Sequence, residues 1–445
     1  MASDLLSIAM SGARAARTGL DVTAHNIANA GTDGYVRRSI SLAEVSGSGI
    51  AARGQDISLS GVRLSSIVRN ADLFRQSEVR RTGADAARAG TEVRGLENIS
   101  AAIEQSRVYP AVVDFEGALQ RLASDPTDAS LRSGVIEAAR TLTGTFNIAA
   151  DGLNGVAGGL QFEATAGVSQ INTLAGELAR VNLRLSRASD ASSDQSTLLD
   201  QRDTLLEQVS KLGTVSTSFA ADGQVSVRMG SSAGPLLVDG GTSNALSMTI
   251  AGNDTITFAL AGGPLTLPGG SLAGQALSLD KLAAVRSDLN TLADSVMTAV
   301  NTAQSAGASL SGSAGTPMFT GSGAAGMTLA FSSGALIATA PAGAVAGSRD
   351  PGNLDALRSA LAASDPAGGL DALIFDVSST VSSRRITQGA LDTIAGNARV
   401  ALQAQSGVDL DEEAVNLVRF QQAFQASGKA MQAASTIFDT LLSLK

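Results

Sequence analysis

The stretch TAHNIANAGTDGY, from Thr23 to Tyr35, decides how this chain folds. Residues before it follow a helical pattern, and the stretch then supplies two asparagines, two glycines and one of only two tyrosines in the chain. Asparagine is a weak helix former that readily forms hydrogen bonds, and Gly31 can take the left-handed conformation in which helices often end. Gly34 can make a second tight turn, and Tyr35 can anchor the departing chain. We therefore predict a helix stop and a fixed change of direction, carried by Asn26, Asn29, Gly31, Gly34 and Tyr35.

Both ends of the chain repeat hydrophobic or small residues every seven positions, the pattern of helices that pack along a narrow stripe. The N-terminal repeat consists of Leu6, Ala13, Leu20 and Ile27. The C-terminal repeat and the positions three residues after it include Leu417, Phe420, Phe424, Met431, Phe438 and Leu441. Taken alone, the pattern fits a helical bundle inside one molecule as well as packing between molecules.

The residues between the two ends predict a mainly α protein with an inserted antiparallel β domain. Residues 214–278 alternate in hydrophobicity, are rich in Val, Thr and Ile, and contain turn signals such as Asp222-Gly223. The segments 36–213 and 279–404 are mostly helical in pattern, with one possible break at 152–159, and 306–350 is irregular with short strands. We expect nested, discontinuous domains. Residues 1–35 and 405–445 form a terminal domain, 36–213 with 279–404 a helical middle domain, and 214–278 a small β domain at the tip.

Composition excludes several classes of function. The chain has 445 residues, a net charge of −9, 3% aromatic residues and no Trp, which argues against binding nucleic acid. Cysteine is absent, so disulfides, thiolate catalysis and cysteine-based zinc sites are excluded. No apolar run is long enough to span a membrane, and the N-terminus lacks the pattern of a cleavable signal peptide.

No catalytic, cofactor-binding or metal-binding residues are predicted. The single histidine, His25, lacks the partners of a triad or a metal site. DLDEE (Asp409–Glu413) lacks the glycine and distal glutamate of a calcium loop, and it fits the charged first turn of a helix. LLDQRD (Leu198–Asp203) is interpreted as surface ion pairs rather than as an acid pair for glycoside cleavage. The glycine-rich runs between Gly262 and Gly274 are interpreted as turns.

Both ends of the chain resemble bacterial flagellar rod, hook and hook-associated proteins. HNIANAGTDGYVRR (His25–Arg38) resembles their N-terminal signature, although His25, Gly31 and Asp33 depart from the usual residues. The C-terminal segment 406–444 is similar to that of the flagellar hook-associated protein 1 family, the hook–filament junction proteins. Three middle segments also resemble that family: ALQRLASDPTDASLRSGVIEAARTLTGTFN (118–147), STLLDQRDTLLEQVSKL (196–212) and VNTAQSAGASLSGSAGTPMFTG (300–321).

The resemblance implies a structural, non-enzymatic role without cofactors. It implies extracellular localisation in the flagellum, at the hook–filament junction, after export by the flagellar type III system without a cleaved signal peptide. The implied partners are further copies of the chain, the hook protein, the next junction protein on the flagellin side, and an export chaperone at the C-terminus. The terminal stripes would then be a coiled-coil assembly interface that orders when subunits stack. The alternatives are a hook, rod or flagellin-like subunit, and a cell-wall hydrolase on a flagellar scaffold.

Overall fold

The computed structural model describes residues 2–32, 34–46, 59–188 and 192–443, which form two compact units. Unit 1 comprises Met1–Ala84, Ile171–Ala245 and Asp392–Lys445, and unit 2 comprises Asp85–Gln170 and Leu246–Leu391. The described helices are α1 (Ala2–Ala28), α2 (Leu73–Ser106), α3 (Val108–Ser124), α4 (Ala129–Leu185), α5 (Ser193–Leu212), α6 (Ser271–Ser305), α7 (Gly323–Gly326), α8 (Gly352–Ser364), α9 (Pro366–Ser406) and α10 (Leu410–Ser443). The predicted class, mainly α with antiparallel strands inserted between helices, is confirmed.

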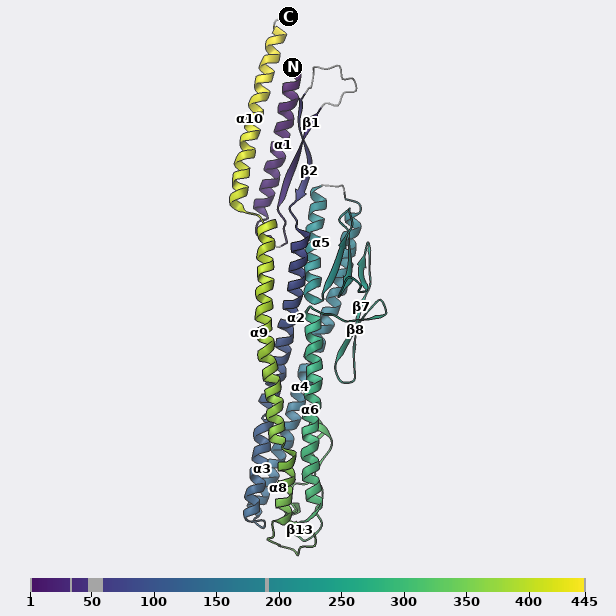
Figure 1. Ribbon diagram of the computed structural model, residues 1–445, viewed down its shortest axis with the longest axis vertical. Helices are drawn as coiled ribbons and strands as arrows, with labels where there is room; N and C mark the ends of the chain where they lie inside the picture. The colour runs from purple at the N-terminus through teal and green to yellow at the C-terminus, as the bar shows by residue number, and fades with distance from the viewer. Residues whose placement is uncertain (1, 33, 47–58, 189–191, 444–445) are drawn as a thin grey trace. The chain divides into compact units, whose positions relative to one another are not determined.

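In unit 1, α1 and α10 lie side by side and antiparallel (Figure 1). Glycines on α1 allow the close approach. A Cβ atom added to Gly19 would lie 2.6 Å from the ring of Phe420, and one added to Gly12 would lie 3.0 Å from the Ser427 hydroxyl. Gly12 and Gly19 are seven residues apart, as are Phe420 and Ser427, so the seam between the two helices repeats once per heptad.

A two-stranded hairpin, which the sequence did not predict, packs on α1 in unit 1 (Figure 1). Its strands are β1 (Arg38–Ser46) and β2 (Leu59–Arg69), paired antiparallel. The backbone N–H of Val62 donates to the Ser11 hydroxyl at 3.1 Å, and Gly61, with φ of +92°, leaves room for that hydroxyl. The helical domain expected from residue 36 onwards therefore begins with strands instead.

The β-rich segment forms two sheets. In unit 1, β3 (Val215–Phe219), β4 (Val225–Met229), β5 (Leu236–Asp239) and β6 (Thr242–Ser243) make four antiparallel strands in chain order. In unit 2, β7 (Leu246–Ile250), β8 (Ile256–Leu260) and β9 (Gly263–Leu265) make three. Asn182 of α4 exchanges two hydrogen bonds with the backbone of Val225 in β4. Asp254 in the β7–β8 turn accepts from Arg286 and Gln161, so each sheet is fixed to a helix of its own unit.

Two glycine-rich segments of unit 2 are helical where the sequence indicated a break or a turn. Helix α4 continues through 152–159 because Leu153 and Leu160 are buried on its core face, and this packing outweighs the low helix propensity of glycine. Helix α6 begins at Ser271 because Gly274 lets it approach α2. A Cβ atom at Gly274 would lie 2.5 Å from the Arg88 carbonyl oxygen.

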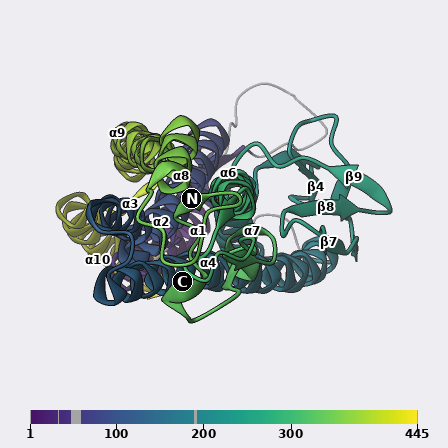
Figure 2. The ribbon, with the colours of Figure 1, turned by 90° about the horizontal axis from the view of Figure 1, so that it is seen from below.

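One end of unit 2 is built from α6, α7 and α8, which Figure 2 shows close together, and from short irregular pieces. These pieces are β10 (Gly307–Ala308), β11 (Phe319–Thr320), β12 (Thr328–Leu329), the 3-10 helix η1 (Gly334–Leu336) and β13 (Ala340–Pro341). Arg132 of α4, 1% exposed, holds this region together. Its guanidinium donates to the carbonyl oxygens of Pro126 at 2.6 Å and Ile337 at 2.9 Å. It also donates to the Thr339 hydroxyl at 2.8 Å.

Replacing Arg132 with Met should lower the free energy of unfolding by about 3 kcal/mol, because several buried acceptors lose their donor at once. Urea denaturation followed by far-ultraviolet circular dichroism measures the change. Arg140→Met is the matched control: the Arg140 side chain is 54% exposed and pairs with Glu137 on the same helix. We expect its effect to stay within about 0.5 kcal/mol. If both variants unfolded at the same urea concentration, Arg132 would not be a structural anchor.

Candidate functional site at the end of helix α1

The change of direction after α1 depends on one buried side-chain amide, that of Asn26, which is 1% exposed. Its Nδ2 donates to the carbonyl oxygen of Arg38 at 2.8 Å, and its Oδ1 accepts from the Arg38 N–H at 3.0 Å. The hydroxyl of Tyr35 donates to the same Oδ1 at 2.8 Å. Asn26 thus pairs with the first residue of β1 as a neighbouring strand would, and so fixes where the hairpin begins.

The other asparagine of the motif acts locally. Asn29 Nδ2 donates to the His25 carbonyl at 2.9 Å, and its Oδ1 accepts from the Thr32 hydroxyl at 3.3 Å. These exposed contacts cap the last turn of the helix, whereas the buried contacts of Asn26 reach across the turn.

The two glycines of the motif differ. Gly34 has φ of +78°, and a Cβ atom there would lie 2.4 Å from the Thr204 hydroxyl oxygen, so both conformation and space require glycine. The predicted left-handed conformation of Gly31 is wrong, because its φ lies outside that region. The end of α1 is closed instead by short-range bonds such as that from Thr32 N–H to the Asn29 carbonyl at 2.9 Å. Asp33 lies outside the described residues.

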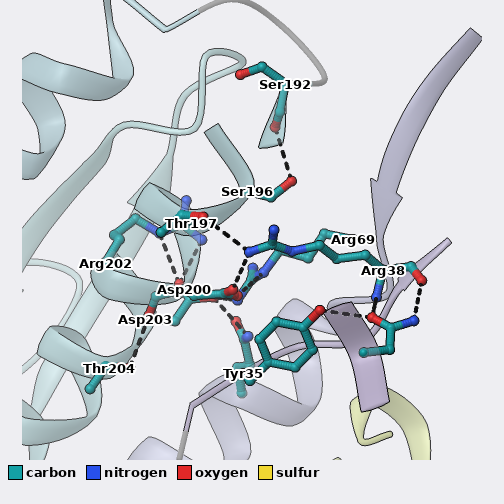
Figure 3. Close-up of polar contacts among 12 residues, drawn as sticks. Tyr35, Arg38, Arg69, Ser192, Ser196, Thr197, Asp200, Arg202, Asp203 and Thr204 are labelled. Carbon is teal, nitrogen blue, oxygen red and sulfur yellow. Dashed lines mark hydrogen bonds and ion pairs between the residues drawn. The ribbon is translucent and has the colours of Figure 1, made fainter. Parts of the chain in front are cut away.

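Behind the turn, a network of charges joins the base of the hairpin to α5 (Figure 3). Arg38 and Arg69 stand opposite each other as register partners of β1 and β2. Asp200 accepts from Arg69 through Oδ1 at 2.6 Å and from Arg38 through Oδ2 at 3.1 Å. One carboxylate therefore joins the ends of both strands and offsets the repulsion between two like charges placed directly across a strand pair.

Asp203, one helical turn further along α5, accepts two hydrogen bonds on each of its carboxylate oxygens. Its Oδ1 accepts from Arg202 Nε at 2.9 Å and Nη2 at 2.7 Å. Its Oδ2 accepts from Arg69 Nη2 at 2.7 Å and from Gln76 Nε2 at 2.9 Å. Burial would raise the pKa of Asp203, but the adjacent arginines and their hydrogen bonds outweigh burial and hold the pKa below its usual value.

The interpretation of LLDQRD as surface ion pairs is therefore wrong. The Arg202 and Asp203 side chains are only 4% and 10% exposed, because the hairpin supplies Arg69 as a further partner and covers this face of α5. The acids are fully engaged by arginines in this arrangement, which suits an anchor rather than a proton-transfer site.

Arg37 links the turn to α10. Its guanidinium donates to Glu413 at 2.7 Å and to Glu412 at 2.8 Å, and its backbone N–H donates to the Ser406 carbonyl at 3.0 Å. Burial alone would lower the pKa of Arg37, but the hydrogen bonds to Glu413 and Glu412 raise it above its usual value. Asp409 Oδ1 caps α10 by accepting from the Asp411 N–H at 2.9 Å. Glu412, in the charged first turn of α10, binds Arg37.

The predicted interface residues are distributed over several faces of the paired helices. Ala13 is buried, Leu20, Leu417, Phe420 and Met431 are half-buried, and Leu6, Ile27, Phe424 and Phe438 are exposed. The side chain of Leu441 lies outside the described residues. Gly12 and Gly19, where α1 lies against Ser427 and Phe420 of α10, were not singled out by the heptad pattern. Two glycines seven residues apart could have indicated them. Arg38 and Arg69 were missed because no local pattern connects them with Asp200.

Within the described part of the chain, no helix is both long and apolar enough to cross a membrane.

Both ends of the chain match families of flagellar axial proteins. Residues 6–35, which hold α1 and the turn, match the family described as flagella basal body rod protein. Residues 402–444, which hold α10, match the C-terminal family of flagellar basal body rod FlgEFG proteins. The paired terminal helices and their anchored turn thus define a flagellar axial protein, a structural component of the bacterial flagellum. Residues 93–319, just over half of the chain, match the helical domain of flagellar hook-associated protein FlgK, and the chain belongs to this family.

Relatives cover nearly the whole chain. Flagellar hook-associated protein 1 of Bacillus subtilis (strain 168) is 25% identical over 96% of this chain and 95% of its own length. That of Escherichia coli (strain K12) is 25% identical over 100% of both. The structure of the flagellar hook junction protein FlgK from Burkholderia pseudomallei has a TM-score of 0.66 and 15% identity, covering 74% of this chain and 100% of that one. At this identity the last match shows a common fold.

Asn26→Ala should lower the stability of the turn by about 3 kcal/mol, because three hydrogen bonds are lost, two of them to the buried backbone of Arg38. Hydrogen exchange of the amides in 36–46, followed by mass spectrometry, should accelerate. Asn29→Ala is the matched control, and we expect a loss of about 1 kcal/mol or less because its contacts are exposed. Equal exchange in both variants would contradict the distinction between the two asparagines.

Unit 1 should lose stability below about pH 4. The folded pKa of Asp203 lies below its unfolded value of about 3.9, so its contribution is complete above that value and is lost as the pH falls through the folded pKa. Asp203→Asn should therefore be less stable at pH 7 and show a flatter decline between about pH 4 and pH 2. Urea denaturation at a series of pH values measures the free energy of unfolding of both proteins. If that free energy fell equally steeply with pH in the variant and the parent, Asp203 would not be the group responsible.

Proposed function

We propose that this chain is a non-enzymatic subunit of the junction between flagellar hook and filament, and that it polymerises through α1 and α10. Membership of the FlgK family supports this role, because the family's helical domain distinguishes hook-associated proteins from the rod proteins matched at the two ends. No observation favours a hook, rod or filament subunit, or a hydrolase.

The observation that carries the assembly role is the apolar surface left open on the paired helices. Phe438 is 52% exposed and Phe424 44%, and the other large apolar side chains exposed on the pair are Leu5, Leu6, Met10, Ile27, Leu410, Val415, Val418 and Ile437. Soluble monomers rarely expose so many large apolar groups on one helix pair, and such surfaces typically bind a partner.

Energetics favour a second copy as that partner. The fully buried apolar residues of α1 and α10 are mostly alanines, and the larger side chains of Leu417, Phe420 and Met431 are only half-buried, so the pair buries little apolar area within one chain. Burial stabilises by about 25 cal/mol per Å², while fixing each residue's backbone costs about 1–2 kcal/mol. Stacking against neighbours would bury the exposed rows as well, and we infer that the terminal segments 1–35 and 405–445 become fully ordered on assembly.

A position at the hook–filament junction also implies the other partners of this chain. One face of the assembled ring would contact the hook protein, and the other would contact the next junction protein, on the flagellin side. Export through the flagellar type III system, with a chaperone at the C-terminus, would deliver the chain outside the cell. The fully paired arginine–aspartate network of unit 1 supports an anchoring function for the turn rather than catalysis.

Phe424→Asp should abolish incorporation into flagella, because a charge would replace an apolar ring in the proposed interface. Gln425→Asp is the control: it adds the same charge at the adjacent exposed position without removing an apolar group. Immunoblots of sheared flagella measure incorporation, and circular dichroism of the purified chains checks folding. A folded Phe424→Asp chain that is incorporated normally would eliminate the proposed role of α10.

A further inference from the structure

A cavity of about 350 Å³ opens in unit 1 between the turn after α1, helices α2 and α5, and the end of α9. Gly34 and Tyr35 line it from the turn, Arg80 from α2, Glu207 from α5 and Gln403 from α9. The space exceeds the roughly 30 Å³ that one water molecule occupies in the liquid, so the cavity can hold a small ligand with its hydration.

Arg80 is the unusual group in this cavity. It is 5% exposed, and its guanidinium donates to the Thr217 hydroxyl at 3.3 Å. Among the residues that the structure describes, no carboxylate oxygen lies within 4.0 Å of it. Burial lowers the pKa of Arg80, but a guanidinium remains charged at neutral pH. Asp203 and Glu207 attract Arg80 and partly compensate its charge without forming a direct ion pair with it. An anion in the cavity would pair with Arg80 directly and lower the cost of its burial further.

Asp203 cannot serve Arg80 without giving up partners. Asp203 accepts four hydrogen bonds, from Arg202, Arg69 and Gln76. A carboxylate has about four lone-pair positions, so Asp203 has no acceptor left.

Glu207 is engaged through one of its two carboxylate oxygens. Its Oε1 pairs with Arg399 and with Lys211, at 3.0 Å from the latter. Three arginines and two acids line the cavity, an excess of positive charge in a chain whose net charge is −9. The charge balance therefore favours an anion over a cation or a neutral ligand.

Gln403, at the end of α9, is a second possible donor in the lining of the cavity. It is exposed, and its side chain makes no hydrogen bond with any described residue. A guanidinium forms strong, charge-assisted hydrogen bonds to an oxyanion, and a side-chain amide N–H can add to them.

We propose that this cavity is a binding site for one small oxyanion, a carboxylate or a phosphate, held by Arg80 and Gln403. The bound anion neutralises the buried guanidinium and bridges α2 to the end of α9, next to the anchored turn. It therefore stabilises unit 1 in proportion to the occupancy of the site.

Titration of the purified monomer tests the site. Inorganic phosphate and acetate are added separately, with sodium chloride keeping the ionic strength constant. Fluorescence of Tyr35, which lines the cavity and is one of two tyrosines, and isothermal calorimetry report binding. We expect saturable binding and a matching rise in Tm. Binding of phosphate alone identifies a tetrahedral oxyanion, and binding of acetate identifies a carboxylate.

Variants assign the binding to the cavity. Arg80→Met should weaken it about tenfold or more. Its Tm without added anion should equal or exceed that of the parent, because an uncompensated charge is removed. Gln403→Ala removes an exposed side chain that makes no hydrogen bond with any described residue, so the variant should fold normally and bind more weakly. Arg75→Met, on the same helix but 41% exposed and paired with Glu78, should bind like the parent. Absence of saturable binding by the parent, or unchanged affinity in folded Arg80→Met or Gln403→Ala, would overturn the proposal.

Discussion

The hydrogen bonds between the Asn26 side chain and the backbone of Arg38 are the constraint on which the architecture of unit 1 depends. A helix cannot offer a strand the alternating N–H and C=O groups that a neighbouring strand offers, but one side-chain amide can. By presenting both groups from inside α1, Asn26 starts β1 beside the helix that precedes it. The hairpin then covers α1, and the glycine face of α1 remains for α10.

Ion pairs with α5 stabilise the hairpin that the Asn26 amide positions. Placing Arg38 and Arg69 opposite each other at the base of a hairpin would be unfavourable in isolation, and Asp200 makes it favourable. Because these groups are largely buried, water and salt screen them less than surface pairs. The segment His25–Arg38 thus ends in an arginine, Arg38, whose partner Asp200 lies 162 residues away on α5.

Sequence reasoning found the helices because their apolar residues repeat at helical spacing, and it found the turn because Asn26, Gly34 and Tyr35 are chemically distinctive. It failed where the structure depends on pairing across long separations. Leu42 and Leu64, exposed cross-strand partners of the hairpin, do not give the alternation of a half-buried strand. Glycine was misread at Gly31 and Gly274, since a glycine can serve a left-handed turn or a close contact with another helix, and only the fold shows which.

The attachments of α1 and α10 also have a mechanical consequence. The helix pair is connected to the rest of unit 1 by the covalent chain at 407–409 and by the ion pair between Arg37 and Glu413. A third connection runs from α1 to α5: Asn26 hydrogen-bonds to the backbone of Arg38, and the Arg38 side chain pairs with Asp200. A body held at one point can swivel, whereas one held at several separated points resists twisting. Torque applied to the terminal helices is therefore shared among these connections and transmitted to α5. The attachment of the helix pair to the rest of unit 1 resists twisting.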